Sequence, residues 1–339
     1  MKPNTRPRLT DVALLAGVST ATASRALSNP DLVAPSTRKA VEDAARTCGY
    51  KVNLVARSLR TQRSQTILVL VPGIGNQFYP EIIEGLESCA RGSGYSIILG
   101  FTGKDAEREQ SYIELLNNQR ADGLVIVDDG VRHMVESGVR FAVPTVQLME
   151  AECGSSIASV RIDDMEAACM ATRHLIELGH RRIAHVCGRK SSIVAGRRLS
   201  GYRKALEGAG LAADAELVLD GTYDFDSGVA AVDRVKAMAQ PPSAVFCAND
   251  ATALGALWRC RKLGIGVPQQ LSIVGIDDIA DAALSDPPLT TIRQPRHQLG
   301  TTGMAVLIEL IDGRHSHDVD IVLPHELVVR ASTAAPAYS

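Results

Sequence analysis

One stretch of the sequence, TATASRAL at residues 20–27, has a composition that is unusual for a helix in a protein core. It places short Ser, Thr and Ala residues around one long side chain, Arg25. Ala23 and Leu27 lie four residues apart, so they share a helix face that we expect to pack inward. The outward face then carries Thr20, Ala21, Ser24 and Arg25. Small side chains let a helix approach base edges in the major groove, where an arginine can bind guanine through two hydrogen bonds.

The charge distribution indicates a polyanionic partner for the same part of the chain. Residues 1–65 hold 11 Lys and Arg against four Asp and Glu, a net charge of +7. The whole chain of 339 residues carries −2, so the remaining 274 residues carry −9. A basic segment on an acidic body is typical of nucleic-acid binding. A solvated charged surface is the alternative interpretation of residues 1–65, and an ordinary small-residue helix is the alternative for residues 20–27. The excess of positive charge favours DNA binding over both.

Three short helices are predicted before residue 50. Their ends are marked by capping residues, which in chain order are Thr10, Gly17, Ser19, Ser36 and Gly49. The tight turn Gly17-Val18-Ser19 joins the first two helices, with Val18 between them, as in a helix-turn-helix. The residues that follow, up to 65, are polar and basic, and we expect a linker with helical potential over 53–60.

From Thr66 onward the sequence alternates between apolar strands and amphipathic helices. Continuous apolar runs such as TILVLVP, GLVIVD and LSIVGID are typical of strands covered on both faces. Helical patterns such as residues 165–178 lie between most of these runs. This alternation predicts an α/β core of two doubly wound parallel sheets, in which ligands bind beyond the carboxyl ends of the strands.

Membrane, secreted and metal-binding proteins are not expected. No apolar run approaches the roughly 18 residues needed to span a bilayer, and the N-terminus lacks the apolar region of a secretory signal. Seven cysteines without C-x-x-C spacing indicate reduced thiols. We therefore expect a cytoplasmic protein with no membrane partner, no bound metal and no cofactor.

An enzyme and a periplasmic solute-binding protein are the two alternative functions. The sequence contains no P-loop, no G-x-S-x-G and no H-E-x-x-H motif, and its eight histidines are dispersed, so catalysis is not expected. A periplasmic solute-binding protein would share the predicted core. It would, however, need a signal peptide in place of the basic N-terminal helices.

The N-terminal segment resembles the DNA-binding domain of the LacI/GalR family of bacterial repressors through LTDVALLAGVSTATASRALSNPDLVAPSTRKAVEDAARTCGY. The likeness continues through NLVARSLRTQRSQTILVLVP, RRLSGYRKAL, VFCANDATALGAL, LSIVGIDDI and DPPLTTIRQP, and covers residues 8–333. The resemblance implies a homodimeric transcriptional repressor that reads pseudo-palindromic double-stranded operator DNA under the control of a small-molecule effector. The C-terminal RASTAAPAYS carries no leucine heptad, so we expect no tetramerising tail.

The resemblance also implies which residues contact DNA. In chain order these are Ser19, Thr20, Ala21, Ser24, Arg25, Asn29, Arg38, Ala56, Arg57 and Leu59. Thr20, Ala21 and Arg25 match positions that contact bases. Leu59 takes the place of a leucine that wedges between base pairs in the minor groove, where unstacking is offset by additional contacts with the bent DNA.

The resemblance divides the chain into three segments. These are a helix-turn-helix domain over 1–52, a hinge helix and linker over 53–65, and an effector-binding and dimerisation core over 66–339. The core is similar to periplasmic sugar-binding proteins, with a cleft between two lobes. Lobe one is expected at about 66–162 and 293–323, and lobe two at about 163–292 and 324–339.

Nine positions match effector-binding positions of the family. They are Phe78, Tyr79, Asp163, Ser192, Val194, Arg198, Tyr223, Asn249 and Asp277. The aromatic rings could stack on a base or a sugar face, and the polar groups could bind hydroxyls or a base edge, which favours a nucleoside or sugar-like effector. Without this context, Asp277-Asp278 would indicate only a turn and Arg198 only a surface charge.

Overall fold

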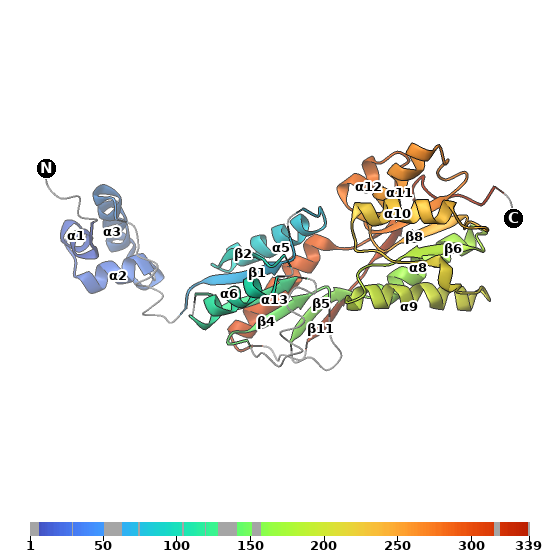
Figure 1. Ribbon diagram of the computed structural model, residues 1–339. Coiled ribbons are helices and arrows are strands. Elements are labelled where there is room, and N and C mark those ends of the chain that lie inside the picture. Colours follow the sequence, from blue (N-terminus) through green and yellow to red (C-terminus); the bar gives the residue numbers. More distant parts are fainter. Residues whose placement is uncertain are drawn as a thin grey trace. The chain divides into compact units, whose positions relative to one another are not determined.

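The computed structural model describes residues 7–28, 30–50, 63–73, 75–103, 105–118, 120–127, 141–150, 157–314 and 319–337. The chain forms two compact units, Met1–Ser64 and Gln65–Ser339, which we call the head and the core (Figure 1). None of the helices in the described ranges combines the length and the apolar character that a membrane span requires.

The head is a small helical unit with its own apolar core. Its helices are α1 (Leu9–Leu15), α2 (Thr20–Ser28), the 3-10 helix η1 (Pro30–Leu32) and α3 (Pro35–Cys48). Val12, Ala23 and Val41, one from each α-helix, are fully buried against one another. Gly17 ends α1 with a left-handed backbone (φ +66°), which glycine adopts without steric cost.

Two of the predicted helix starts in the head are wrong by a few residues. The first helix begins at Leu9 rather than after Thr10, because the amide of Arg8 donates to the Asp11 carboxylate at 2.7 Å and caps the earlier start. The third begins at Pro35 rather than after Ser36, since the fixed φ of proline suits the first turn of a helix.

The core contains two six-stranded sheets, each built from segments that are not contiguous in the chain. The first has the order β11-β5-β4-β3-β1-β2 and all its strands are parallel. Its strands are β1 (Thr66–Val71), β2 (Ser96–Phe101), β3 (Gly123–Val127), β4 (Thr145–Leu148), β5 (Ala158–Ile162) and β11 (Asp320–Leu323). The helices of this lobe include α5 (Tyr79–Gly92), α6 (Ala106–Asn117) and α13 (Arg296–Ile311).

The second sheet has the order β12-β10-β9-β8-β6-β7. Its strands are β6 (Ile183–Val186), β7 (Val218–Leu219), β8 (Ala244–Cys247), β9 (Ser272–Asp277), β10 (Thr290–Arg293) and β12 (Glu326–Val328). Its helices are α8 (Asp164–Glu177), α9 (Ile193–Gly208), η2 (Ala215–Leu217), α10 (Phe225–Lys236), α11 (Asp250–Leu263) and α12 (Ala280–Leu284). β12 pairs antiparallel with β10, so this sheet is parallel except at one edge.

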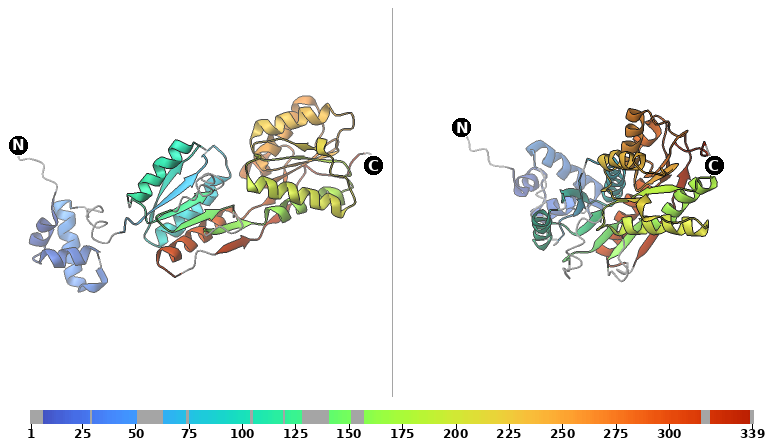
Figure 2. Two further views of the ribbon diagram at one scale, coloured as in Figure 1. Left: turned by 60° about the horizontal axis from the view of Figure 1, so that its bottom comes forward. Right: turned by 45° about the vertical axis from the view of Figure 1, so that its right-hand side comes forward.

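Helices cover both faces of each sheet, which explains the continuous apolar runs in the strands (Figure 2). In β1, Ile67, Val69 and Val71 join the apolar cluster on the side of α5 and α13. Leu68 and Leu70, which point the other way, join the cluster on the side of α6. The chain passes between the sheets three times, after β5, after β10 and between β11 and β12.

Candidate functional site

The outward face of α2 in the head is formed by the residues that the sequence predicts there. Thr20, Ala21 and Arg25 are exposed and Ser24 is half-buried. Ala23 is fully buried on the opposite face, against the other helices of the head. The helix thus presents short side chains and one guanidinium group to the outside, a surface that fits the major groove of DNA.

Two further predicted DNA-contacting residues lie at the start of α2 and on α3. Ser19 caps α2, because its hydroxyl accepts a hydrogen bond from the amide of Thr22 at 3.1 Å. Arg38, on α3, pairs with Glu42 at 2.8 Å, and 44% of its side chain remains exposed. The other four positions, Asn29, Ala56, Arg57 and Leu59, lie outside the described residues.

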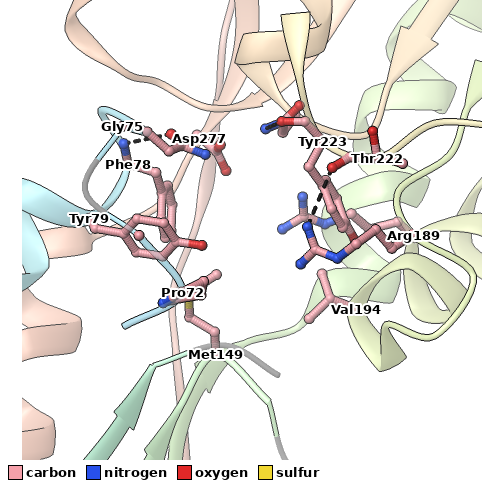
Figure 3. Close-up of a pocket in the computed structure, with 14 residues that line it drawn as sticks. Pro72, Gly75, Phe78, Tyr79, Met149, Arg189, Val194, Thr222, Tyr223 and Asp277 are labelled. Carbon is pink, nitrogen blue, oxygen red and sulfur yellow. Dashed lines mark hydrogen bonds between the residues drawn. The ribbon is translucent and has the colours of Figure 1, made fainter. Parts of the chain in front are cut away.

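The core contains a cavity of about 250 Å³ between the two lobes, at the carboxyl ends of the strands. Seven of the nine predicted effector positions line it, namely Phe78, Tyr79, Val194, Arg198, Tyr223, Asn249 and Asp277. Its other lining residues are Pro72, Gly73, Gly75, Asn76, Met149, Arg189 and Thr222. Figure 3 shows Phe78, Tyr79 and Met149 on one wall and Tyr223, Arg189 and Val194 on the other.

Aromatic rings stand on both walls of the cavity (Figure 3). The rings of Phe78 and Tyr79 lie 5.6 Å apart in an edge-to-face arrangement on the wall of lobe one. On the wall of lobe two, the Tyr223 ring lies 5.2 Å from the guanidinium centre of Arg189 and 6.0 Å from that of Arg198. Such rings can stack on a flat ligand from either side.

Glycine at position 188 makes room for the Tyr223 ring. A Cβ atom at Gly188 would lie 1.9 Å from the ring carbon Cζ, so a larger residue there would force the Tyr223 ring to move. Tyr223 itself has a left-handed backbone (φ +69°), and its carbonyl accepts a hydrogen bond from the Asn249 side-chain amide at 3.0 Å. The hydrogen bond from Asn249 therefore fixes the backbone of Tyr223, and the absence of a side chain at position 188 leaves space for its ring.

Arg198, which lines the cavity, forms a buried ion pair with Asp164. Arg198 is 3% exposed and its Nη2 atom lies 2.7 Å from a carboxylate oxygen of Asp164, which is 2% exposed. Burial raises the pKa of Asp164, and the charge of Arg198 opposes that rise. The guanidinium also donates to the carbonyl of Ala248. Arg198 is thus a preoriented cation at the carboxyl ends of the strands of lobe two.

Asp277 lines the cavity on a strained segment of backbone. Asp277 and Asp278 have φ angles of +134° and +55°, both unfavourable for residues with a Cβ atom. The Asp277 carboxylate accepts a hydrogen bond from the Gln294 amide at 2.8 Å. Burial raises the pKa of Asp277 well above its usual range, with Arg198 opposing this rise. Such a carboxyl group can exchange hydrogen bonds with the hydroxyls of a ligand.

Asp163 and Ser192 are not among the residues that line the cavity. Each is the N-cap of a helix. The Asp163 carboxylate accepts a hydrogen bond from the backbone amide of Glu166 at 3.0 Å, and the Ser192 hydroxyl accepts one from the backbone amide of Ala195 at 3.3 Å. The Ser192 hydroxyl lies 3.4 Å from the phenol oxygen of Tyr223. Asp163 therefore stabilises α8, and its neighbour Asp164 is the residue that reaches Arg198.

Sequence analysis missed seven lining residues, and a signal existed for some of them. Asn76, Arg189 and Thr222 are polar residues shortly after β1, β6 and β7, where ligands of doubly wound sheets bind. No sequence pattern marks Met149, which has a left-handed backbone (φ +73°). Among the described residues there is no group of three or more His, Cys, Asp or Glu that could hold a metal ion.

Family models match both parts of the chain. Residues 8–53 match the model described as bacterial regulatory proteins, lacI family, and residues 172–333 match the periplasmic binding protein-like domain. Among curated proteins, the HTH-type transcriptional repressor CytR of Escherichia coli (strain K12) is 38% identical over 337 residues, which are 98% of each chain. The repressor PurR of Vibrio atlanticus (strain LGP32) is 37% identical over 95% of this chain and 97% of its own.

Solved structures of transcriptional regulators have the same fold. The lac repressor dimer bound to operator and the anti-inducer ONPF matches with a TM-score of 0.85 and 30% identity, over 98% of this chain and 100% of that one. A complex of the transcriptional regulator CelR with cellobiose matches with a TM-score of 0.72 and 33% identity, over 96% and 100%.

The similarity to CytR agrees with a finer resemblance in the sequence. The stretches VSTATASRAL, SQTILVLVP and DPPLTTIRQP are similar to the cytidine repressor within the family. Three findings point to the same family. Both units of the chain match its domain models, the sequence is 38% identical to the repressor CytR over 98% of the chain, and the fold is that of the lac repressor. The chain therefore belongs to the lacI family of DNA-binding bacterial regulatory proteins.

Proposed function

We propose that this protein is a homodimeric transcriptional repressor whose affinity for a pseudo-palindromic operator is controlled by a nucleoside or sugar-like ligand bound between the two lobes of the core. One observation carries the assignment of the ligand. The cavity combines rings on opposite walls, Tyr79 and Tyr223, with the buried polar groups of Arg198, Asn249 and Asp277. A ring-bearing polyol would use both, since its flat face stacks and its hydroxyls bind the polar groups.

In this proposal the head reads the operator through α2. Arg25 would bind a guanine in the major groove, and Thr20 and Ala21 would contact neighbouring base edges. Leu59 would insert into the minor groove from the hinge helix. Because it acts on chromosomal DNA, we place the protein in the cytoplasm.

The surface around α12 is the one that we assign to the second copy of the chain. Large apolar side chains are exposed there, with exposed fractions of 41% for Phe225, 44% for Trp258 and 81% for Leu284. They border a groove of about 320 Å³ on one face of lobe two. An exposed apolar cluster of this kind on a soluble regulator is typical of a dimer interface.

The two lobes suggest how a ligand could act on DNA binding. A ligand changes operator affinity only if it binds two arrangements of the core with different affinity. The first strand of the core, β1, begins at Thr66 and directly follows the predicted hinge. A change in the angle between the lobes would therefore alter the spacing of the two hinge segments in a dimer.

A panel of ligands tests the proposed effector class. Thermal unfolding of the full chain is followed with cytidine, uridine, adenosine, inosine, ribose, galactose and citrate, and isothermal titration calorimetry measures the affinity of every compound that raises the Tm. We expect a nucleoside or a sugar to raise the Tm, and Tyr223→Ala to weaken its binding about tenfold through loss of stacking. Stabilisation by citrate alone would contradict the stacking argument.

A further inference from the structure

A set of polar contacts joins the two lobes at the rim of the cavity. Arg296, the first residue of α13, is 6% exposed and lies at the point where the chain returns to lobe one. Its Nη2 atom donates to the Glu81 carboxylate at 2.7 Å and to the carbonyl of Asp278 at 2.8 Å. Its Nη1 atom donates to the carbonyl of Gln77 at 3.4 Å. One guanidinium thus connects α5 of lobe one with the strained segment of lobe two.

A second contact spans the lobes beside it. The side-chain amide of Gln77, in the segment between β1 and α5, donates to the carboxylate of Asp281 on α12 at 2.7 Å. The two residues are 204 positions apart in the sequence. Neither of them lines the effector cavity, whereas Phe78, next to Gln77, and Asp277, four residues before Asp281, both line it.

From these contacts we propose that Gln77, Asp281 and Arg296 are positioning residues for effector binding. They hold the wall that carries Phe78 and the wall that carries Asp277 at the separation a ligand needs, without contacting the ligand. The proposal rests on the effector site proposed above and adds the residues that set its affinity.

The energetic reason is preorganisation. If only a fraction of molecules has its walls at the correct separation, the apparent affinity falls in proportion to that fraction. Removing a contact that spans the lobes lowers the fraction, because only the joined arrangement contains that contact. Asp281 also borders the groove that carries Leu284, so the same contact connects the cavity wall with the surface that we assign to the second copy.

The pair Gln77 and Asp281 permits a sharp test, because its amide and carboxylate can be exchanged between the two positions. Gln77→Glu alone places two carboxylates within reach of each other and removes the donor. Asp281→Asn alone leaves an amide oxygen that still accepts from Gln77. Gln77→Glu combined with Asp281→Asn restores a hydrogen bond of the same length and opposite direction. Glu87→Gln, which breaks an exposed ion pair to Arg91 within α5, is the matched control.

Hydrogen–deuterium exchange of the full-length, ligand-free protein is the first readout. Gln77→Glu should accelerate exchange about fivefold or more in peptides covering both 77–84 and 278–284, since it removes the hydrogen bond that joins the lobes and places two carboxylates opposite each other. The combined variant, Asp281→Asn and the control should exchange as the wild type does. Unchanged exchange in Gln77→Glu, or acceleration that persists in the combined variant, would overturn the proposal.

Calorimetry with cytidine is the second readout. Cytidine affinity should fall about tenfold in Gln77→Glu and return to within about twofold of wild type in the combined variant. Equal affinity in the wild type and in Gln77→Glu would overturn the positioning role. If cytidine does not bind the wild type, the proposed effector class is weakened, and the exchange measurement alone decides whether this contact couples the lobes.

Discussion

Replacement of Arg198 by methionine should destabilise the core as well as abolish effector binding. Arg198→Met leaves the Asp164 carboxylate, which is 2% exposed, without its counter-ion at 2.7 Å. Removing one partner of a buried ion pair costs about 3–5 kcal/mol of the free energy of unfolding. Burial already raises the pKa of Asp164, and loss of Arg198 should raise it further. The variant should therefore take up a proton on Asp164 as the pH falls.

This proton uptake determines how the loss of stability in Arg198→Met depends on pH. A carboxyl whose pKa is higher in the folded than in the unfolded protein penalises folding above its folded pKa, and the penalty disappears as the pH falls below the unfolded value. Arg198→Met should thus be destabilised more at pH 8 than at pH 5. Arg198→Met combined with Asp164→Asn removes the uncompensated charge and should recover about 2 kcal/mol or more at pH 8.

Urea unfolding followed by circular dichroism at pH 5 and pH 8, together with calorimetry against cytidine, separates the two roles of Arg198. Both variants should lose cytidine binding, because Arg198 lines the cavity, whereas only the single variant should be strongly destabilised. A loss below about 1 kcal/mol at pH 8 would refute the argument from the buried charge. Wild-type cytidine affinity in the combined variant would remove Arg198 from the effector site.

Other parts of the chain carry further predictions. Arg25→Ala should weaken operator binding by about 1–3 kcal/mol and relax the preference at one symmetric base pair, which selection from random duplexes will measure. Arg38→Ala should weaken binding to all sequences alike, which salt titrations will measure. Leu284→Lys should raise the dimer dissociation constant at least about tenfold in sedimentation equilibrium, since it places an unpaired charge in the proposed interface. His185 is fully buried between Tyr202 and Phe246, and burial lowers its pKa from 6.5 to about 4. The stability that the neutral imidazole contributes is therefore present at neutral pH and is lost as the pH falls from about 6.5 towards 4. His185→Phe should therefore flatten the acid side of a stability profile measured by urea unfolding at pH 4.5, 5.5 and 7, and an unchanged slope would show that His185 does not cause it.

The central strands could be predicted from the sequence because their burial on both faces leaves a continuous apolar run. TILVLVP corresponds to β1, whose last five residues are buried. The short edge strands could not be predicted in this way. β7 has only two residues, and β11 and β12 are partly exposed, so their sequences resemble loops. Their positions follow from pairing with strands that are distant in the chain.

The residues of the cavity show a similar limit. Arg198 could be selected from a motif, but its partner Asp164 lies 34 positions earlier and no local pattern joins them. Asp163 matches an effector-binding position of the family, but its carboxylate accepts a hydrogen bond from the backbone amide of Glu166 and caps α8 instead. Arg189 lines the cavity beside the Tyr223 ring, and that ring occupies the space that a Cβ atom at Gly188 would fill. These side chains meet because of tertiary packing, which cannot be predicted from their spacing in the sequence.

Operator binding with and without ligand tests the central claim most directly. Duplexes selected by the full-length protein from a random pool are sequenced, and fluorescence anisotropy measures its affinity for the selected site and for a scrambled site, each with and without saturating cytidine. We predict a pseudo-palindromic motif bound at least about 10³-fold more tightly than the scrambled site, and an affinity for it that cytidine changes at least about fivefold. Equal affinity for both duplexes would contradict sequence-specific repression, and an operator affinity that neither cytidine nor any compound of the ligand panel alters would contradict control by the cavity.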